Sequence, residues 1–363
     1  MKIKKDWLLF GTVILLALFG LIMIYSASSV WANYKFDDPF KFVKNQGLFF
    51  VVGIFLMLIL RKINYKFYMK YANLILFGCF ILLVLVLVPG IGTVRNGSRS
   101  WFGIGSFGIQ PSEFAKIGLI IYVSKYLSQN QRDLRYIIKG VLPILGVVFL
   151  FFGLIILEPD FGTGMVMVLT LVGIIFISGV KISFFIKVGL AGLLGVVGLI
   201  IAAPYRMARI VSFLNPWTDP LGSGYQIIQS LYAIGPGGLL GQGFMNSRQK
   251  SFYLPEPQTD FIFSIISEEF GFLGVLIVTF FFGFIFYQCI KISMKQSDLF
   301  AKYLSFGLSF GLIIQSLLNL MVVVGLIPVT GVTLPFLSYG GSSLLVSMAS
   351  IGIVLNIGNS VKS

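Results

Sequence analysis

Residues 254–263 read Leu-Pro-Glu-Pro-Gln-Thr-Asp-Phe-Ile-Phe, so a polar, proline-rich run leads directly into a long apolar segment. Only 13 of the 363 residues are acidic, yet Asp260 stands where a membrane helix is expected to begin. A carboxylate in that position is costly unless it has a function or a partner. Asp260 and three later polar residues have the spacing i, i+4, i+7 and i+8, so on a helix they would form one polar stripe. Such a stripe must face a cavity or other helices rather than lipid. The members of that stripe are Asp260, Ser264, Ser267 and Glu268.

Apolar blocks of membrane-spanning length make up most of the chain. The apolar fraction is 57%, the charged fraction is 11% and the mean hydropathy is +0.95. Soluble domains carry about 25% charged residues, and a bilayer core of ~30 Å needs about 20 apolar residues per helix. We therefore expect an all-α, polytopic membrane protein with about ten transmembrane helices, forming a single membrane domain over residues 1–363. The predicted spans are 7–30, 43–60, 70–88, 113–127, 140–157, 163–180, 184–203, 261–290, 303–325 and 339–358.

The basic residues indicate how this protein is oriented. An even number of spans puts both termini on one side, and most of the 27 lysines and arginines lie at the chain ends or in the short loops of that side. Cytoplasmic loops carry such an excess, so both termini are expected in the cytoplasm. The first apolar block follows three lysines but is too long for a signal peptide, and we expect it to be retained.

Two long loops, 89–112 and 204–260, fall on the predicted outer side. Long structured loops usually carry function, and these contain basic residues against the usual bias. Arginine suits phosphate because it can form paired hydrogen bonds. A phosphate-bearing ligand is one interpretation, and contact with lipid headgroups is the other. The outer cations are Arg95, Arg99, Arg206, Arg209, Arg248 and Lys250.

Carboxylates recur at three expected helix starts. Asp260 could act as a general base or bind a cation, or it could simply favour the helix dipole. Glu113 and Lys116, spaced i, i+3 after Pro111, could be an ion pair on a capped helix or the charged mouth of a polar cavity. Asp160 follows Glu158 and a proline, and these residue types are equally typical of an ordinary turn.

Several classes of function are excluded by what the sequence lacks. There is no histidine, which removes histidine metal sites, Ser-His-Asp triads and histidine proton relays. Cys79 and Cys289 lie in apolar runs and suggest no disulfide framework. The glycine-rich run 235–243 lacks a preceding strand and a Walker lysine, so it is not a nucleotide-binding loop. Nothing indicates a nucleic-acid partner. An enzyme of this kind would need a substrate that brings its own leaving group.

Taken together, several motifs are highly specific. They are Tyr25–Ser28, Arg95–Trp101, Gln110–Lys116, Pro159–Thr163, Tyr225–Gly238, Leu254–Phe263 with Glu268 and Glu269, and Pro328–Ser343. With these motifs, nearly the whole chain resembles the SEDS family of bacterial shape, elongation, division and sporulation proteins, which includes RodA, FtsW and SpoVE. The motifs at Arg95–Arg99 and Leu254–Phe263 are more similar to the FtsW and SpoVE branch, and SpoVE is the nearest resemblance.

The resemblance implies a peptidoglycan glycosyltransferase of the bacterial cytoplasmic membrane, with an active site that faces outward and lipid II as substrate. It also implies a partner, a class B penicillin-binding protein that acts as transpeptidase. The family's essential aspartate falls on Asp260. Its other polar cavity residues fall on Glu113, Lys116 and Asp160, and its outer-loop tryptophan falls on Trp101. Gln258 and Thr259, beside the essential aspartate, are expected to contact substrate.

This activity fits the chemistry of the residues. Asp260 would take the proton from the acceptor hydroxyl as it attacks the donor sugar, which a positioned base accelerates by about 10²–10⁴. Lys116 and the outer arginines would hold the pyrophosphate leaving group, with or without a divalent cation. An α-linked donor that gives a β-linked glycan implies a single inverting displacement.

Two rival functions share these features. A lipid II flippase would need a polar path across the bilayer, and the inner halves of the predicted spans are nearly free of acids, which disfavours it. A scaffold that only holds the transpeptidase would tolerate the loss of Asp260.

Overall fold

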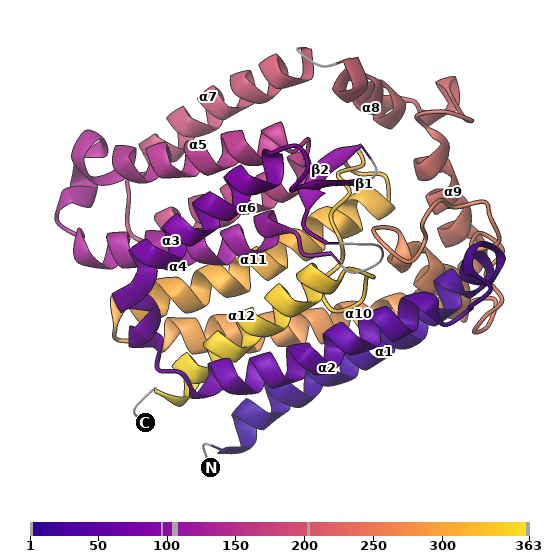
Figure 1. Cartoon of the computed structure of the whole chain (residues 1–363), viewed down its shortest axis with the longest axis horizontal. Helices are drawn as coiled ribbons and strands as arrows, with labels where there is room; N and C mark the ends of the chain where they lie inside the picture. The colour runs from indigo at the N-terminus through magenta and orange to yellow at the C-terminus, as the bar shows by residue number, and fades with distance from the viewer. Residues whose placement is uncertain (1–2, 96, 104–107, 202–203, 361–363) are drawn as a thin grey trace.

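The computed structural model describes residues 3–95, 97–103, 108–201 and 204–360, and Figure 1 shows a bundle of long helices with a small hairpin and short helices at one end. The longer helices are α1 (Ile3–Phe36), α2 (Lys41–Lys62), α3 (Tyr65–Leu87), α4 (Pro111–Gln129), α5 (Leu142–Leu157), α6 (Phe161–Ile177), α7 (Ile182–Ile201), α10 (Ile262–Met294), α11 (Leu299–Val323) and α12 (Gly341–Asn359). The remaining elements are β1 (Thr93–Arg95), β2 (Ser98–Trp101), α8 (Pro204–Leu214), α9 (Tyr225–Ile234) and the short helical turns η1 (Asp133–Arg135), η2 (Ile137–Val141), η3 (Pro216–Thr218) and η4 (Gly235–Gly237).

The helices confirm the all-α membrane fold. Seven segments of the described chain are long and apolar enough to cross a membrane, and α6 and the first part of α7 are shorter apolar helices. Together with α4, these helices coincide with the ten predicted blocks, although the exact number of spans stays a prediction. Within the described residues, the β-strands lie in the predicted outer loop 89–112, where β1 and β2 form an antiparallel pair.

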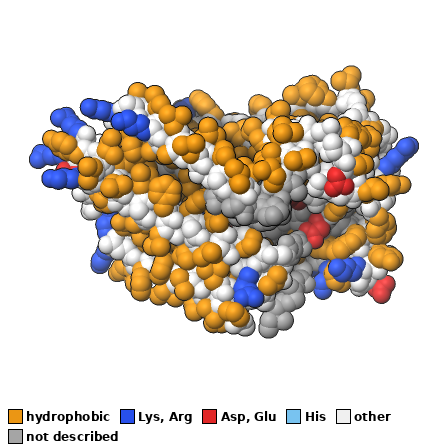
Figure 2. Space-filling model, turned by 90° about the horizontal axis from the view of Figure 1, so that it is seen from above, with side chains coloured by type: hydrophobic (Ala, Val, Ile, Leu, Met, Phe, Trp, Pro, Cys, Tyr) orange, Lys and Arg blue, Asp and Glu red, His pale blue; other side chains and the backbone are white. Residues whose placement is uncertain are grey.

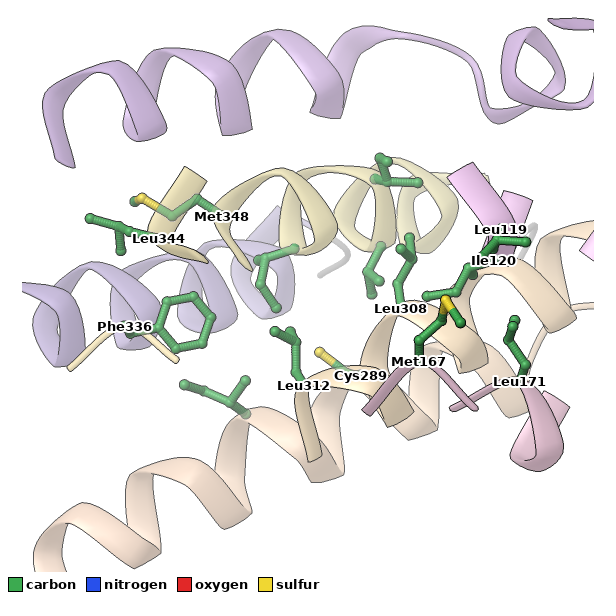
Figure 3. Close-up of a cluster of buried hydrophobic side chains, with 14 of the residues drawn as sticks. Leu119, Ile120, Met167, Leu171, Cys289, Leu308, Leu312, Phe336, Leu344 and Met348 are labelled. Carbon is green, nitrogen blue, oxygen red and sulfur yellow. The ribbon is translucent and has the colours of Figure 1, made fainter. Parts of the chain in front are cut away.

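The centre of the bundle is formed by α4, α6, α11 and α12. Figure 3 shows Leu119 and Ile120 from α4 facing Leu308 of α11, with Met167 of α6 beside them. The most enclosed span is α12, with 83% of its apolar window buried, and it packs mainly against α2. By contrast, α7 follows the edge of the bundle in Figure 1 and is exposed along most of its length.

The start of α1 and the end of α12 lie at the same end of the bundle (Figure 1). There the Arg61 guanidinium lies 4.5 Å from the Trp7 ring, and Asn356 donates a hydrogen bond of 2.8 Å to the Arg61 carbonyl. Lys and Arg side chains gather at the left end of the molecule in Figure 2, with others at its right end and lower edge, while its flanks are largely apolar. Which end faces the cytoplasm stays a prediction.

Helix α10 is broken at Gly271, a feature that the sequence analysis did not foresee. The backbone there has φ 61° and ψ −158°, and outer-loop residues 237–243 occupy the break. The loop backbone therefore replaces the hydrogen bonds that the helix loses. The replacement bonds run from Gln242 N to Glu268 O (2.9 Å), Gly243 N to Glu269 O (3.0 Å), Phe272 N to Gly238 O (2.8 Å) and Leu273 N to Leu239 O (3.1 Å).

We expect Gly271→Ala to lower the thermal midpoint of the purified protein. A Cβ at this position would lie 2.4 Å from the Gly241 nitrogen and 2.7 Å from the Leu239 carbonyl carbon, and such backbone strain costs about 1–3 kcal/mol. Gly283→Ala is the matched control, because its Cβ would meet nothing within 4 Å on the same helix. Equal midpoints for the two variants would show that the break is not constrained.

Candidate active site

Asp260 lies in a turn just before α10 rather than on the helix. The turn closes because the Thr259 N–H and hydroxyl both donate to the Glu256 carbonyl, at 3.0 and 2.7 Å. The same hydroxyl lies 3.0 Å from Asp260 Oδ1. Asn319 of α11 donates to the Asp260 carbonyl at 2.7 Å and to the Val332 carbonyl at 2.8 Å. The half-buried carboxylate is thus presented by a loop fixed to α11.

The predicted polar stripe is therefore incomplete, because Asp260 precedes the helix that carries the other members. Ser264 meets Ser230 of α9 at 2.7 Å. Glu268 turns toward the outer loop, where it accepts hydrogen bonds from the Ser247 hydroxyl and the Arg248 N–H at 2.5 and 2.8 Å. Ser264 and Glu268 therefore contact neighbouring protein rather than lipid, as expected for a polar stripe on a membrane helix.

Lys116 has the buried partners that its depth requires. Its ammonium lies 2.9 Å from Glu113 Oε1 and donates to Gln315 Oε1 at 2.8 Å, while Lys116 and Glu113 are only 7% and 6% exposed. Gln315 in turn donates to the Ser343 hydroxyl and the Thr333 carbonyl, both at 3.1 Å. The second oxygen of Glu113 is buried with no hydrogen-bond partner in the described part of the chain.

One face of α11 connects Lys116 to Asp260. Gln315 and Asn319 are spaced i, i+4, so their side chains lie one helical turn apart on the same face. Gln315 holds the Lys116 ammonium, and Asn319 holds the backbone of Asp260. The side-chain hydrogen bonds of these two amides thus link the two charged residues.

Asp160 joins the start of α6 to the start of α4. Its Oδ1 accepts a hydrogen bond from the Thr163 N–H at 3.1 Å, which caps α6. Its Oδ2 accepts one from Gln110 Nε2 at 2.7 Å, and the Ser112 hydroxyl lies 3.4 Å away. This residue therefore has the structural role of a helix cap while its second oxygen lies at the tip of the helix that carries Lys116.

The outer hairpin brings two of the predicted substrate residues together. The Arg95 guanidinium lies 5.0 Å from the centre of the Trp101 ring, and Asn96 lies outside the described residues. Arg99 reaches the Leu87 carbonyl at 3.5 Å, at the base of the hairpin.

Tyr339, which lies just before α12, is bonded to the Asp260 loop. Its N–H donates to the Gln258 carbonyl at 2.8 Å. Gln258 is only 2% exposed, and its side-chain oxygen has no hydrogen-bond partner among the described residues. The predicted contacts of Gln258 and Thr259 with substrate thus come from residues that lie directly beside Asp260.

Not every predicted outer cation can reach a ligand. Arg206 and Arg209 belong to α8, but their side chains lie outside the described part of the structure. For Lys250 the expectation was wrong, because its ammonium is buried against Glu269 at 2.8 Å and the Ser26 hydroxyl at 3.0 Å. This ion pair ties the outer loop to α1 and α10. Residue spacing could not reveal it, since Ser26 and Lys250 are distant in sequence.

Glu158 is a fully buried carboxyl at the end of α5. It is 0% exposed, and neither side-chain oxygen has a hydrogen-bond partner in the described residues. Burial, with a smaller contribution from the Asp160 charge, raises the pKa of Glu158 to about 9. The side chain is therefore protonated at neutral pH, and it lies where the Ser98 hydroxyl of the hairpin donates to the Glu158 carbonyl.

We expect Glu158→Gln to flatten the pH dependence of stability. The folded-state pKa of about 9 lies above the ordinary value of 4.5, so the folded protein binds more protons than the unfolded chain between these values. Stability should fall as the pH rises through that window, by at most ~1.4 kcal/mol per unit. Thermal midpoints in detergent between pH 5 and 8 measure this slope. Asp219→Asn, at an exposed loop carboxylate, should leave the slope intact.

Among the described residues, no three His, Cys, Asp or Glu side chains converge to hold a metal ion.

A cavity of about 30 Å³, large enough for one water, lies beside Lys116 and Gln315. Figure 2 shows the molecule hollowed near the middle of one face, with an acidic side chain in the hollow.

Sequence reasoning missed several neutral members of this site. Gln110, Thr333 and Ser343 hold the charged groups in place through the bonds described above. Gln110 lies in the motif Gln110–Lys116 and Ser343 lies in the motif Pro328–Ser343, but neither side chain was assigned a role. Neutral side chains carry little signal alone, since the same residues also serve as ordinary helix caps.

The fold and the buried polar site at one end of the bundle define a multi-pass membrane protein with a charged site near a membrane surface. The sequence model of the FtsW/RodA/SpoVE family, described as cell cycle protein, matches residues 6–363. The chain therefore belongs to this family.

Individual relatives are similar over almost their full length. The chain is 52% identical to stage V sporulation protein E of Bacillus subtilis, covering 98% of this chain and 97% of the relative. It is 42% identical to a probable peptidoglycan glycosyltransferase FtsW of Trichlorobacter lovleyi, covering 99% and 94%.

Solved structures agree with these relatives. One, from work on the structural coordination of polymerization and crosslinking by a peptidoglycan synthase complex, has a TM-score of 0.80 and 30% identity, covering 97% of both chains. The rod shape determining protein RodA of Thermus thermophilus has a TM-score of 0.72 and 27% identity, covering 98% and 97%. The membrane fold of this chain is thus shared along its whole length.

Proposed function

We propose that this chain is a peptidoglycan glycosyltransferase that polymerises lipid II at the outer leaflet, with Asp260 as general base. The observation that carries the proposal is the polar face of α11, where Asn319 and Gln315 hold the Asp260 backbone and the Lys116 ammonium one turn apart. The relatives named as peptidoglycan glycosyltransferases support the reaction class. The basic opposite end of the bundle supports an outward-facing site.

In this proposal Asp260 accepts the proton of the acceptor hydroxyl as that oxygen attacks the anomeric carbon of the donor sugar. The bond from that carbon to the pyrophosphate breaks in the same displacement, with inversion. The base is a carboxylate that the Thr259 hydroxyl orients. Gln258 lies beside it, and its side chain is buried in this structure.

Lys116 stabilises the negative charge that develops on the pyrophosphate. Its ammonium has three protons, and two are used by Glu113 and Gln315. Arg95, Arg99 and Trp101 form the outer wall of the substrate site, and Arg206 and Arg209 of α8 stay predicted contacts of the substrate. Asp160 fixes the tip of α4 on which Lys116 depends. A divalent cation, if one takes part, would be shared with the phosphates, as Mg²⁺ commonly is.

The partner in this proposal is a class B penicillin-binding protein. The support is the structural neighbour from work on a peptidoglycan synthase complex that polymerises and crosslinks. Exposed apolar side chains along α10, among them Phe272, Leu276 and Phe280, offer a face for one membrane anchor. Such an anchor would lie against lipid-facing residues and leave the polar site open to substrate.

Incubation of the purified chain with lipid II in detergent, with and without the transpeptidase, tests the activity. Glycan polymer is the expected product, and detergent removes the second leaflet that a flippase needs. Movement of lipid II across vesicles without polymer would favour the flippase. Complementation by Asp260→Ala in cells would favour the scaffold.

A further inference from the structure

The outer loop contains a pocket that the proposed reaction does not use, lined by polar and aromatic side chains. Its volume is about 300 Å³, at the lower end of the range for ligand sites, about 300–1,000 Å³. It lies between α9, η4 and the loop that fills the break in α10. Its lining residues are Tyr232, Pro236, Gln242, Arg248, Gln249 and Glu268.

The floor of this pocket is rigid. Glu268 accepts hydrogen bonds from the Ser247 hydroxyl at 2.5 Å and from the backbone N–H groups of Arg248 and Gln249 at 2.8 and 3.4 Å. The neighbouring Lys250–Glu269 ion pair ties the same segment to α1 and α10. A ligand would therefore meet a surface that is already organised, which lowers the entropic cost of binding.

The pocket also offers hydrogen-bonding groups of both kinds. The Gln249 side-chain oxygen is buried and has no hydrogen-bond partner within the described residues. The Gln242 amide is exposed at the pocket, and its nitrogen donates to the Pro236 carbonyl at 2.7 Å, which fixes its orientation. A neutral ligand rich in hydroxyl and acetamido groups would satisfy such amides.

Two aromatic rings stand at the edge of this pocket. Tyr232 lines it, and Trp217 of η3 lies 5.9 Å from the Tyr232 ring. Both rings are about half exposed, at 50% and 57%. Exposed aromatic faces beside polar groups suit ligands with one apolar face and a polar rim, and a pyranose ring, with axial C–H bonds and equatorial hydroxyls, has that form.

We infer that this pocket is a subsite for an N-acetylated glycan, which holds a segment of the growing strand away from the reacting sugars. The inference rests on the proposed function, because it supplies the polymer that would occupy the site. Tyr232 and Trp217 contact the sugar faces, and Gln242 and Gln249 bond the acetamido and hydroxyl groups. Arg248, exposed at the mouth, meets the acidic substituents of the strand.

Binding of chitotetraose to the full-length Asp260→Asn protein in detergent, measured by calorimetry, tests the subsite without turnover. Trp217→Ala and Tyr232→Ala should each weaken binding by roughly 2- to 10-fold. Tyr34→Ala is the matched control, because Tyr34 is an outer aromatic that is 79% exposed on α1, and it should leave binding unchanged. Equal affinities in all variants, or no binding at all, overturn the subsite.

A second measurement follows the polymer itself. These variants are made in the active protein, which retains Asp260. At equal consumption of lipid II, Trp217→Ala and Tyr232→Ala should yield shorter glycan strands than either the unsubstituted protein or Tyr34→Ala. Strands of unchanged length overturn the inference while leaving the proposed function intact. Absence of polymer from the unsubstituted protein overturns the proposed function, and the chitotetraose experiment still decides whether the pocket binds glycan.

Discussion

Purified Asp260→Asn protein should polymerise lipid II at least about 10²-fold more slowly than the unsubstituted chain, because a positioned base contributes about 10²–10⁴ in rate. The amide keeps the shape of the side chain but has no basic oxygen to take up the proton. The Thr259 hydroxyl and the Asn319 amide still hold the loop, since Asn319 bonds the backbone carbonyl. The folded structure should therefore survive the substitution.

Single-turnover rates and thermal midpoints, measured on the same preparation, separate chemistry from folding. Asp219→Asn is the matched control, an exposed carboxylate in the same outer loop that bonds only locally to Ser223, and it should keep full activity. Polymerisation by Asp260→Asn at the unsubstituted rate would rule out the base. A lowered midpoint would instead indicate that the carboxylate stabilises the loop.

Lys116→Met should lower the free energy of unfolding by about 3–5 kcal/mol, because it leaves a buried carboxylate uncompensated. Glu113 is only 6% exposed, and its second oxygen already lacks a partner among the described residues. The double variant Lys116→Met/Glu113→Gln should recover most of this loss, since a neutral amide replaces the buried charge. It should remain inactive, because nothing then neutralises the pyrophosphate.

The Lys250–Glu269 pair provides the comparison, since it is equally buried but lies outside the proposed site. Lys250→Met should also destabilise, and Lys250→Met/Glu269→Gln should recover both stability and polymerisation. Thermal midpoints and polymer yield, measured on all four variants, give the result. Activity in the repaired Lys116 variant would show that its ion pair serves folding alone.

The membrane fold could be predicted because hydropathy alone reports it, and each predicted block coincides with a helix of the structure. The partners of Lys116 could be anticipated in part, since a cation so deep requires a carboxylate, and Glu113 was one turn away. Its other partner, Gln315, comes from a helix nearly 200 residues later in the chain. Helical periodicity describes which residues share a face but not which helix that face meets.

The break in α10 could not be predicted for a related reason. Gly271 lies in an apolar run that is compatible with an uninterrupted span, and the loop that completes it looks like a simple glycine-rich turn. Only the three-dimensional arrangement shows that loop carbonyl and N–H groups replace the missing helical bonds. Lys250 was misinterpreted for the same reason, because its burial depends on how this loop packs against α1 and α10.

The inserted loop has a consequence for how the protein is made. The first turns of α10 cannot satisfy their own backbone inside the membrane, so they depend on a segment synthesised about 30 residues earlier. That segment must already be on the outer side and within reach when α10 is inserted. Folding of the first third of this helix is therefore coupled to translocation of the preceding loop. The helix and the loop are expected to become resistant to protease at the same moment.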